Sequence, residues 1–366
     1  MPKFTPLIES LPSSIPFVGP EALERRLGSA IKARIGANES VFGPAPSVIA
    51  AIQEHAHEAW MYGDPENYDL KVALAAHLGI ASENICVGEG IDGLFGYAVR
   101  LFVEQGSKIA TSNGAYPTFN FHVAGFGGRL ITTPYIEDRE DPASLLKLAS
   151  QEKARVIYFA NPDNPIGTVW PAIDMQRFID AVPDDTMLML DEAYTEFADT
   201  DTRPIIDTTR KNLLRFRTFS KAYGLAGARV GYVIGHADVI RAFDKIRNHF
   251  GVARLSQVAA MAALKDQVWL KHVVDETQQS RERIYEIAKD NNLVPVMSAT
   301  NFVAVDCGAN GAYARRIVDG LLHHGIFIRV PSVAPLNRCF RVSCGTPKHL
   351  DLFAQALPKV LELIHA

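Results

Sequence analysis

Residues 155–194 read RVIYFANPDNPIGTVWPAIDMQRFIDAVPDDTMLMLDEAY. The stretch opens and closes on nearly continuous apolar runs, RVIYFA at 155–160 and MLMLDEA at 187–193, which are typical of strands buried on both faces. Between them, residues 173–181 have the amphipathic spacing of a helix. A strand, a helix and a second strand in this order predict a βαβ unit with parallel strands.

The same alternation of apolar runs and helical segments continues on both sides of this unit. Helical patterns occur at residues 91–103 and 142–151. Five further strand candidates are residues 84–88, 108–112, 129–134, 213–219 and 229–235. This order predicts an α/β fold with a parallel or mostly parallel sheet covered by helices on both faces.

The pattern changes near residue 236. A long helical region runs from residue 237 to about residue 291, with a break around Gly251. Beyond it, strand candidates at 300–308, 325–331 and 339–345 and helix candidates at 313–324 and 349–364 follow. A smaller α+β domain is expected there, so that the 366 residues make roughly two domains at about 150 residues each.

Composition excludes several classes of partner. The 37 Lys and Arg against 41 Asp and Glu give a net charge of -4, which offers no reason to expect nucleic acid. No apolar run approaches the ~18 residues of a membrane span, and the Pro-rich N-terminus does not resemble a signal peptide. The four scattered cysteines have no CxxC spacing, so we expect free thiols in a reducing, cytoplasmic compartment and neither a disulfide nor a metal site.

A glycine-rich turn is the first chemical signal. Residues 88–93, GEGIDG, match GxGxxG, follow a strand and open a helix. A nicotinamide cofactor would also need an acidic residue about 20 positions further on. Residues 110–113, ATSN, contain none. A dinucleotide site is therefore disfavoured, whereas a site for another phosphate and a plain tight turn both stay open.

Four later segments lie at loops after strands, where open α/β sheets bind ligands. They are NPDNPIG at 161–167, DEAY at 191–194, TFSK at 218–221 and GAR at 227–229. A carboxylate at the end of an apolar strand is costly to bury without a cation, and a lysine there is either paired or used in chemistry. Taken singly, each segment is ordinary. Their joint order predicts one binding site.

With the glycine-rich turn and the aromatic loop before them, these segments resemble the fold-type-I pyridoxal-phosphate enzymes of the aspartate aminotransferase superfamily. More narrowly, the chain is similar to histidinol-phosphate aminotransferases, from Ala37 to Thr346. The resemblance implies a large domain with a mostly parallel seven-stranded sheet and a smaller α+β domain. It divides the chain into an N-terminal arm at 1–35, which packs with the small domain or a dimer partner, a large domain at 36–250 and a small domain at 251–366.

The resemblance also implies roles for the residues that would hold pyridoxal 5'-phosphate. Lys221 would form the Schiff base with the cofactor and then act as the base for the substrate Cα proton. Asp191 would pair with the pyridine N–H. Asn164 and Tyr194 match residues that hydrogen-bond the phenolic oxygen, and Tyr116 matches the aromatic residue that stacks on the ring.

The glycine-rich turn then becomes a helix N-terminus that holds a single phosphate. The implied phosphate ligands are the backbone amides of Gly90 and Ile91, the Asp92 segment, Thr218, Ser220 and Arg229. Tyr62 matches a tyrosine that the family contributes across the subunit interface. This implies a homodimer with shared active sites.

Besides Asn164, the resemblance assigns three side chains to substrate binding. Arg341 matches the arginine that binds the substrate carboxylate, for which a guanidinium fork is well suited. Asn38 lies in the N-terminal loop that lines the site. Arg329 is a candidate for a distal anionic group, with a surface salt bridge as the alternative.

The expected activity is transamination between histidinol phosphate or an aromatic amino acid and a 2-oxo acid such as 2-oxoglutarate. A pyridoxal-phosphate decarboxylase of the threonine-phosphate type, a nicotinamide-dependent oxidoreductase and a non-catalytic ligand-binding relative stay open as alternatives. The chain departs from the family pattern at several positions, which leave the cofactor chemistry intact but keep the amino donor open: Phe17, Ser40, Val41, Gly93, Asp163 and Ile166.

Overall fold

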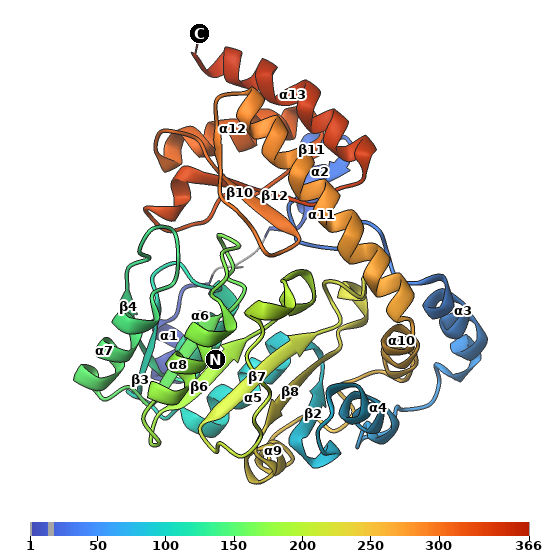
Figure 1. The fold of residues 1–366 in the computed structure, drawn as a ribbon, viewed down its shortest axis with the longest axis vertical. Helices are drawn as coiled ribbons and strands as arrows, with labels where there is room; N and C mark the ends of the chain where they lie inside the picture. Colours follow the sequence, from blue (N-terminus) through green and yellow to red (C-terminus); the bar gives the residue numbers. More distant parts are fainter. Residues whose placement is uncertain (1, 14–17, 366) are drawn as a thin grey trace.

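The computed structural model describes residues 2–13 and 18–365, so Phe17 lies outside the described residues. The described chain forms two lobes (Figure 1). The larger lobe is built around a seven-stranded sheet, and the smaller lobe around a three-stranded sheet and a two-stranded one. None of the helices described is long and apolar enough to cross a membrane.

The seven strands predicted from the apolar runs form one sheet. Neighbouring strands are parallel except at β8, which is antiparallel to both β2 and β7. The mostly parallel sheet is therefore confirmed. In spatial order the strands are β2 (Ile85–Gly88), β8 (Gly231–Gly235), β7 (Leu213–Thr218), β6 (Met187–Asp191), β5 (Val156–Ala160), β3 (Lys108–Ser112) and β4 (Arg129–Thr133).

Helices cover both faces of this sheet, because alternate strand residues point to opposite sides. In β5, Val156 and Tyr158 pack with α5 (Gly90–Phe102), α6 (Pro117–Gly125) and α9 (Ala237–Phe243). Ile157 and Phe159 pack on the other face with α7 (Pro142–Glu152) and α8 (Ala172–Ala181). This two-sided burial explains why the strand sequences are continuously apolar.

The smaller lobe contains the remaining predicted strands. Its antiparallel sheet has the order β12 (Cys339–Ser343), β10 (Phe302–Asp306) and β9 (Val294–Pro295). Helices α12 (Gly311–His323) and α13 (Pro347–His365) pack on its core. The strand predicted at 325–331 is shorter, since only β11 (Ile326–Phe327) is regular and an isolated bridge joins Arg329 to Arg341.

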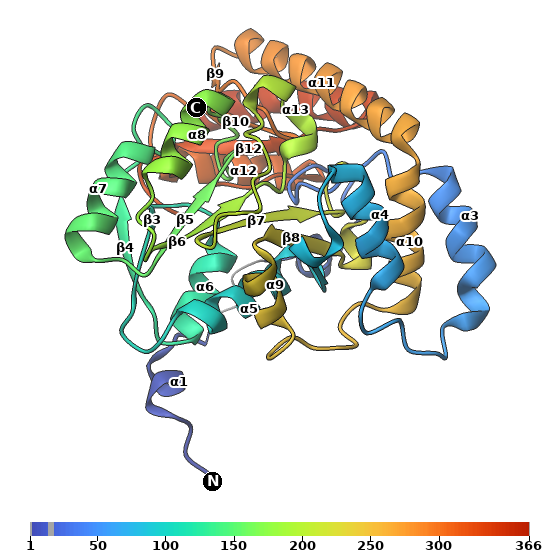
Figure 2. The same cartoon turned by 60° about the horizontal axis from the view of Figure 1, so that its bottom comes forward.

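The part of the N-terminal segment from Val18 to Arg34 joins this smaller lobe, where the backbone carbonyl of Val18 accepts a hydrogen bond from Arg329. The segment contains two short helices, α1 (Pro6–Ser10), which projects away from the small lobe (Figure 2), and α2 (Pro20–Leu27). Next, β1 (Ala33–Arg34) pairs in parallel with β11. The expected arm at residues 1–35 therefore ends in a strand of the small lobe.

The expected domain boundary at residue 250 stays a prediction. Along the chain, the change from the hydrophobic cores of the large lobe to that of the small lobe comes after residue 250, within α11. Helix α10 (Arg254–Lys265) packs with α3 (Pro46–His55) and α4 (Tyr68–Leu78) of the large lobe (Figure 2). Helix α11 (Gln267–Asp290) then runs from one core to the other. Its Val273 packs under the large sheet, whereas its Ile284 lies in the core of the small lobe.

Candidate active site

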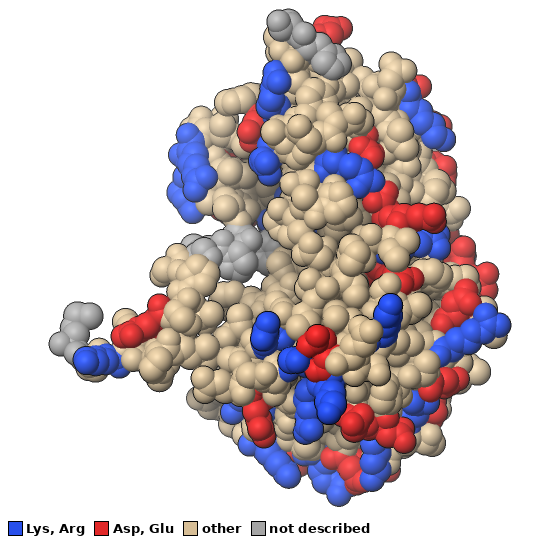
Figure 3. All heavy atoms as spheres, turned by 90° about the vertical axis from the view of Figure 1, so that its left-hand side faces the viewer, with Lys and Arg blue, Asp and Glu red and all other residues tan. Residues whose placement is uncertain are grey.

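A cavity of about 1200 Å³ lies between the lobes, where the loops after β5, β6 and β7 meet the first turn of α5. The molecular surface is hollowed between the two lobes (Figure 3). Among the predicted site residues, all but Gly90 and Tyr62 line the cavity. The predicted residues that line the cavity are Asn38, Ile91, Asp92, Tyr116, Asn164, Asp191, Tyr194, Thr218, Ser220, Lys221, Arg229, Arg329 and Arg341.

Asp191 ends β6 and is only 6% exposed. Its Oδ2 accepts a hydrogen bond from the hydroxyl of Tyr158 at 2.7 Å, and its Oδ1 accepts one from the backbone N–H of Ala193 at 2.9 Å. Burial raises the pKa of Asp191 to about 6, although these two hydrogen bonds oppose the shift. Among the described residues, no arginine or lysine forms an ion pair with it. A buried carboxylate of this kind fits a cationic partner from outside the chain, such as a protonated ring nitrogen.

Lys221 follows β7 by three residues and reaches the same cavity. Its Nζ donates a hydrogen bond to the backbone carbonyl of Asn38 at 3.2 Å and lies 5.6 Å from the centre of the Tyr194 ring. The amine of Lys221 is only partly buried, so it can meet a carbonyl group in the cavity. This is the geometry that a covalent tether requires.

The hydroxyl of Tyr194 is the meeting point of two amides. It accepts hydrogen bonds from Asn38 Nδ2 at 2.9 Å and from Asn164 Nδ2 at 3.3 Å. The described residues offer no acceptor for its own proton. Tyr194 can therefore donate to an oxygen atom of a bound molecule.

The first turn of α5 and the loop after β7 form a cradle for an anion. Gly90 has a φ of +79°, and an added Cβ there would collide with the guanidinium of Arg229. That guanidinium donates to Ser220 Oγ at 3.3 Å and lies 3.6 Å from Asp92 Oδ2. Thr218 accepts a hydrogen bond from the backbone N–H of Ser220 at 3.0 Å. A guanidinium, hydroxyls and a helix N-terminus together suit a phosphate group.

Tyr116 stands at the start of α6 and faces the cavity. Its hydroxyl donates to Asp92 Oδ1 at 3.0 Å, and burial raises the pKa of this tyrosine above its ordinary value. Because Asp92 also lies beside Arg229, the hydrogen bond fixes the Tyr116 ring relative to the anion cradle. An aromatic wall beside that cradle fits a flat heterocycle carrying a phosphate.

Arg329 and Arg341 face each other in an antiparallel bridge of the small lobe. Side chains at directly opposed positions lie on the same face, and both guanidinium groups line the cavity. Arg341 donates to Asn164 Oδ1 at 2.6 Å and lies 4.8 Å from the centre of the Phe302 ring, while its buried Nε has no hydrogen-bond partner. Burial lowers the pKa of both arginines. Two cations opposed in this way favour an anion between them.

Tyr62 lies outside the cavity and is 77% exposed. The centre of its ring lies 4.7 Å from the centre of the Phe250 ring. The expected role of Tyr62 across a subunit interface stays a prediction.

Three buried residues behind the cavity were given no role in the site from the sequence. Behind Asn164, the buried Asp163 accepts a hydrogen bond from Tyr135 at 2.8 Å, and burial raises its pKa to about 7. Nearby, buried Glu140 accepts from the backbone N–H of Ala160 at 3.0 Å. Tyr158 was missed as well. The only signal for it is a tyrosine within an otherwise apolar strand, and such a signal does not identify the partner.

The chain is similar to several known proteins. The family model described as aminotransferase class I and II matches residues 30–357. A histidinol-phosphate aminotransferase of Moorella thermoacetica is 31% identical over 365 residues, which cover 99% of this chain and 94% of that protein.

Solved structures are also similar. The histidinol-phosphate aminotransferase of Sinorhizobium meliloti, in complex with pyridoxal-5'-phosphate, is 57% identical with a TM-score of 0.97, and the match covers 100% of this chain and 99% of that one. The L-threonine-O-3-phosphate decarboxylase of Porphyromonas gingivalis is 20% identical with a TM-score of 0.77, covering 90% of this chain and 99% of that one. At this lower identity, the likeness extends to the fold alone.

Proposed function

The chain belongs to the class I and II aminotransferases, a pyridoxal-phosphate-dependent family, and within that activity we propose that its amino donor is histidinol phosphate. The acceptor would be a 2-oxo acid, with 2-oxoglutarate as the first candidate. Neither the threonine-phosphate decarboxylase nor the nicotinamide oxidoreductase considered from the sequence is favoured.

The opposed pair Arg329 and Arg341 carries the proposal for the donor. A phosphate monoester brings up to two negative charges and three acceptor oxygens, which two guanidinium groups can share. Phenylalanine would bring a single carboxylate, which carries one negative charge and two acceptor oxygens to the pair. The pair also suits 2-oxoglutarate, because its two carboxylates can each meet one arginine. The same two residues could therefore bind donor and acceptor in turn.

The residues of the cavity fit pyridoxal phosphate at each of its functional groups. Arg229, Ser220 and the first turn of α5 would hold the phosphate, and Asp191 would face the ring nitrogen. Tyr194 would donate to the phenolic oxygen, and Lys221 would bind the aldehyde carbon. When bound, the cofactor supplies an electron sink for the bond broken at the substrate Cα.

Lys221 would also move the proton that transamination requires. Once the donor has displaced it from the cofactor, its free Nζ would take the proton from the substrate Cα and deliver it to the carbon that carried the cofactor's aldehyde. The carbonyl of Asn38, 3.2 Å away, holds the amine in the cavity, which is closed on one side by the small lobe. Arg341 would orient the substrate so that its Cα–H faces this amine.

A homodimer with shared sites is part of the same proposal. The exposed Tyr62 and its neighbour Phe250 present an aromatic pair that a second copy of the chain could cover. A cytoplasmic location is also proposed, and the four free cysteines agree with a reducing compartment.

A donor panel tests the proposal directly. The holoenzyme would be assayed with 2-oxoglutarate and histidinol phosphate, phenylalanine, tyrosine or threonine phosphate, with glutamate and carbon dioxide both measured. We expect kcat/KM for histidinol phosphate to exceed that for phenylalanine about 10- to 100-fold, because a charge-assisted contact contributes roughly 1.5–3 kcal/mol. Preference for phenylalanine, or release of carbon dioxide from threonine phosphate, would contradict the proposed donor.

Substitution of Arg329 separates the anion subsite from the rest of the site. Arg329→Gln should raise the KM for histidinol phosphate about 10- to 100-fold while changing that for phenylalanine far less. The matched control is Arg315→Gln, which alters an exposed arginine at the rim of the same cavity. Equal effects of the two substitutions would show that Arg329 has no specific role.

A further inference from the structure

Tyr158 places a hydroxyl group against the buried carboxylate of the cavity. It lies in the middle of β5, its side chain is 0% exposed, and it donates to Asp191 Oδ2 at 2.7 Å. The backbone N–H of Ala193 donates to the other oxygen at 2.9 Å. Each oxygen of Asp191 therefore has one donor from the chain, and together the two donors fix the orientation of the carboxylate.

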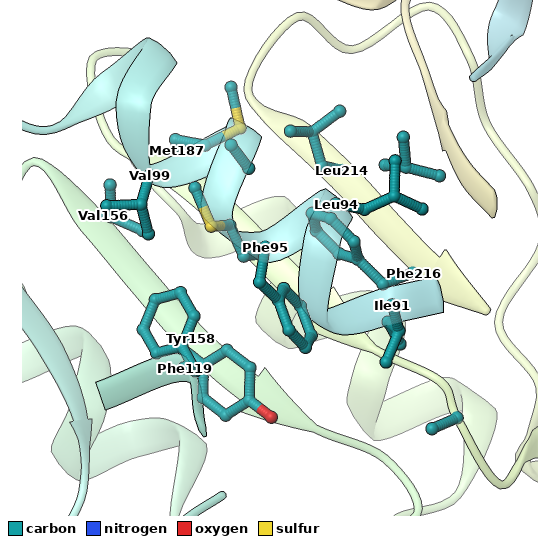
Figure 4. Close-up of a cluster of buried hydrophobic side chains, with 14 of the residues drawn as sticks. Ile91, Leu94, Phe95, Val99, Phe119, Val156, Tyr158, Met187, Leu214 and Phe216 are labelled. Carbon is teal, nitrogen blue, oxygen red and sulfur yellow. The ribbon is translucent and has the colours of Figure 1, made fainter. Parts of the chain in front are cut away.

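The ring of Tyr158 is held by two phenylalanines (Figure 4). It stacks on Phe119 with centres 4.2 Å apart and an interplanar angle of 16°. Phe95 meets it edge-on, with centres 5.6 Å apart. Because the Tyr158 ring packs closely against both phenylalanine rings, its hydroxyl cannot turn away from Asp191.

This aromatic group joins the elements that surround the expected cofactor. Phe95 lies on α5, whose first turn contains Gly90 and forms the anion cradle. Phe119 lies on α6, which begins directly after Tyr116. Tyr158 therefore packs on the two helices that carry the anion cradle and Tyr116, and it holds Asp191 in a fixed position relative to both.

The hydroxyl also affects the charge of Asp191. Burial raises the pKa of Asp191, and the hydrogen bond from Tyr158 is the largest influence in the opposite direction. Without that hydroxyl the carboxyl would become neutral at a higher pH, and a neutral acid cannot pair with a protonated nitrogen. The other titratable groups that act on Asp191 or Tyr158 are Asp92, Lys221, Tyr116 and Glu140.

We propose that Tyr158 is a positioning residue, whose hydroxyl aims Asp191 at the ring nitrogen of pyridoxal phosphate and stabilises the charged form of the carboxylate. This inference rests on the role proposed for Asp191. It adds a residue that touches neither cofactor nor substrate and acts only through Asp191.

The test measures binding of pyridoxal phosphate to the apoprotein rather than turnover. Affinity would be determined by absorbance titration between pH 5 and pH 9 for the wild type, Tyr158→Phe and Asp191→Asn. The control is Tyr232→Phe, which alters a buried tyrosine of β8 that does not line the cavity. The phosphate of the cofactor titrates in the same range, but it does so equally for every variant.

Loss of the hydroxyl should weaken binding about tenfold at pH 7 and move the acid midpoint of binding upward by about one pH unit. Tyr232→Phe should do neither. A uniformly weaker affinity with an unchanged midpoint would mark a merely structural role and overturn the inference, as would an equal shift in the control.

Asp191→Asn distinguishes a failure of the role of Tyr158 from a failure of the role proposed for Asp191. If that variant binds pyridoxal phosphate as tightly as the wild type, the role of Asp191 itself is wrong. If it binds weakly while Tyr158→Phe keeps the wild-type midpoint, only the role of Tyr158 is wrong. Should Tyr158→Phe fail to fold, Phe119→Leu retains the hydroxyl but loosens its stack. It should shift the midpoint in the same direction by less, and no shift would overturn the inference.

Discussion

Asp138 and Arg338 form an ion pair between the two lobes. Arg338 Nη2 lies 2.8 and 2.7 Å from the two carboxylate oxygens of Asp138, which belongs to the loop between β4 and α7. The same arginine donates through Nε to Asp306 at 2.7 Å. Because Arg338 stands three residues before Arg341, the pair fixes the strand that carries Arg341 relative to the large lobe.

Asp138→Asn should therefore weaken substrate binding without affecting the cofactor. A partly exposed ion pair contributes roughly 1 kcal/mol, which corresponds to a factor of about five. We expect the KM of the amino donor to rise by about that factor while the affinity for pyridoxal phosphate stays unchanged. Asp174→Asn, which breaks an exposed pair with Arg177 on α8, serves as the control. An equal rise in KM for both variants would refute the link between the lobes.

Lys221→Ala should remove both the covalent tether and the proton carrier. Turnover should fall by at least about 1000-fold, since a positioned acid–base group alone contributes 10²–10⁴-fold. After reduction with borohydride, mass spectrometry should find the cofactor attached to the wild-type chain and absent from the variant. Lys211→Ala, at a surface pair with Asp238, should behave as the wild type. Normal turnover of Lys221→Ala would disprove its role.

Gly90→Ala tests the anion cradle. Gly90 and Gly79 both have positive φ, +79° and +69°, so alanine is strained at either position. Only at Gly90 would the added Cβ collide with Arg229, whereas nothing lies within 4 Å of it at Gly79. We expect the dissociation constant of pyridoxal phosphate to rise about tenfold or more in Gly90→Ala, because Arg229 must leave Ser220. In Gly79→Ala it should stay constant, and equal constants for both variants would contradict the cradle.

The sequence was most informative where burial or turn chemistry is local. Strands buried on both faces must be apolar throughout, so β5 and β6 could be recognised directly. Helices α4 and α6 could not, because their apolar residues are spread around the axis and leave no clear stripe. The two-residue strand β1 is too short for any periodicity, and only its pairing with β11 defines it.

Some features of the site could likewise be predicted from the sequence, and others could not. Residues at or just after the ends of strands, such as Asp191 and Lys221, could be placed at one edge of the sheet from their order alone. The contact between Tyr158 and Asp191 depends on the register of β5 against β6, which brings together residues 33 positions apart. Likewise, Asn38 meets Ser343 across 305 positions. Neither contact leaves a local signal in the sequence.

Glu192 should make stability depend on pH in the acid range. It is 2% exposed and lies 2.5 Å from Arg215 and 2.9 Å from Arg217. Burial alone would raise its pKa, but the two arginines outweigh burial and bring the pKa to about 2, below the ordinary 4.5. The stabilisation is therefore complete above about pH 4.5 and is lost as the pH falls to about 2, with a size of order 3 kcal/mol.

Glu192→Gln isolates this contribution. At pH 7 the variant should lose about 3–5 kcal/mol, because two buried arginines lose their counterion. The difference from the wild type should then shrink below pH 4.5, as measured by urea unfolding at pH 7, 4.5 and 3. Glu286→Gln, at an exposed pair with Arg283, should show no such trend. A constant difference between Glu192→Gln and the wild type at all three pH values would contradict the pKa.

Complementation between two inactive variants tests whether Tyr62 acts across a dimer interface. Tyr62→Ala and Lys221→Ala should each be nearly inactive alone, provided that Tyr62 completes the site of a partner. In a mixed dimer, the chain that keeps Lys221 would receive Tyr62 from its partner, so one of the two sites would be intact. Random exchange of subunits should then restore about a quarter of the wild-type activity. If Tyr62 serves the site of its own chain, every site in the mixture lacks one residue and no activity returns. Sedimentation of the same mixture would verify that subunits have exchanged, so that an inactive mixture of dimers refutes the shared site.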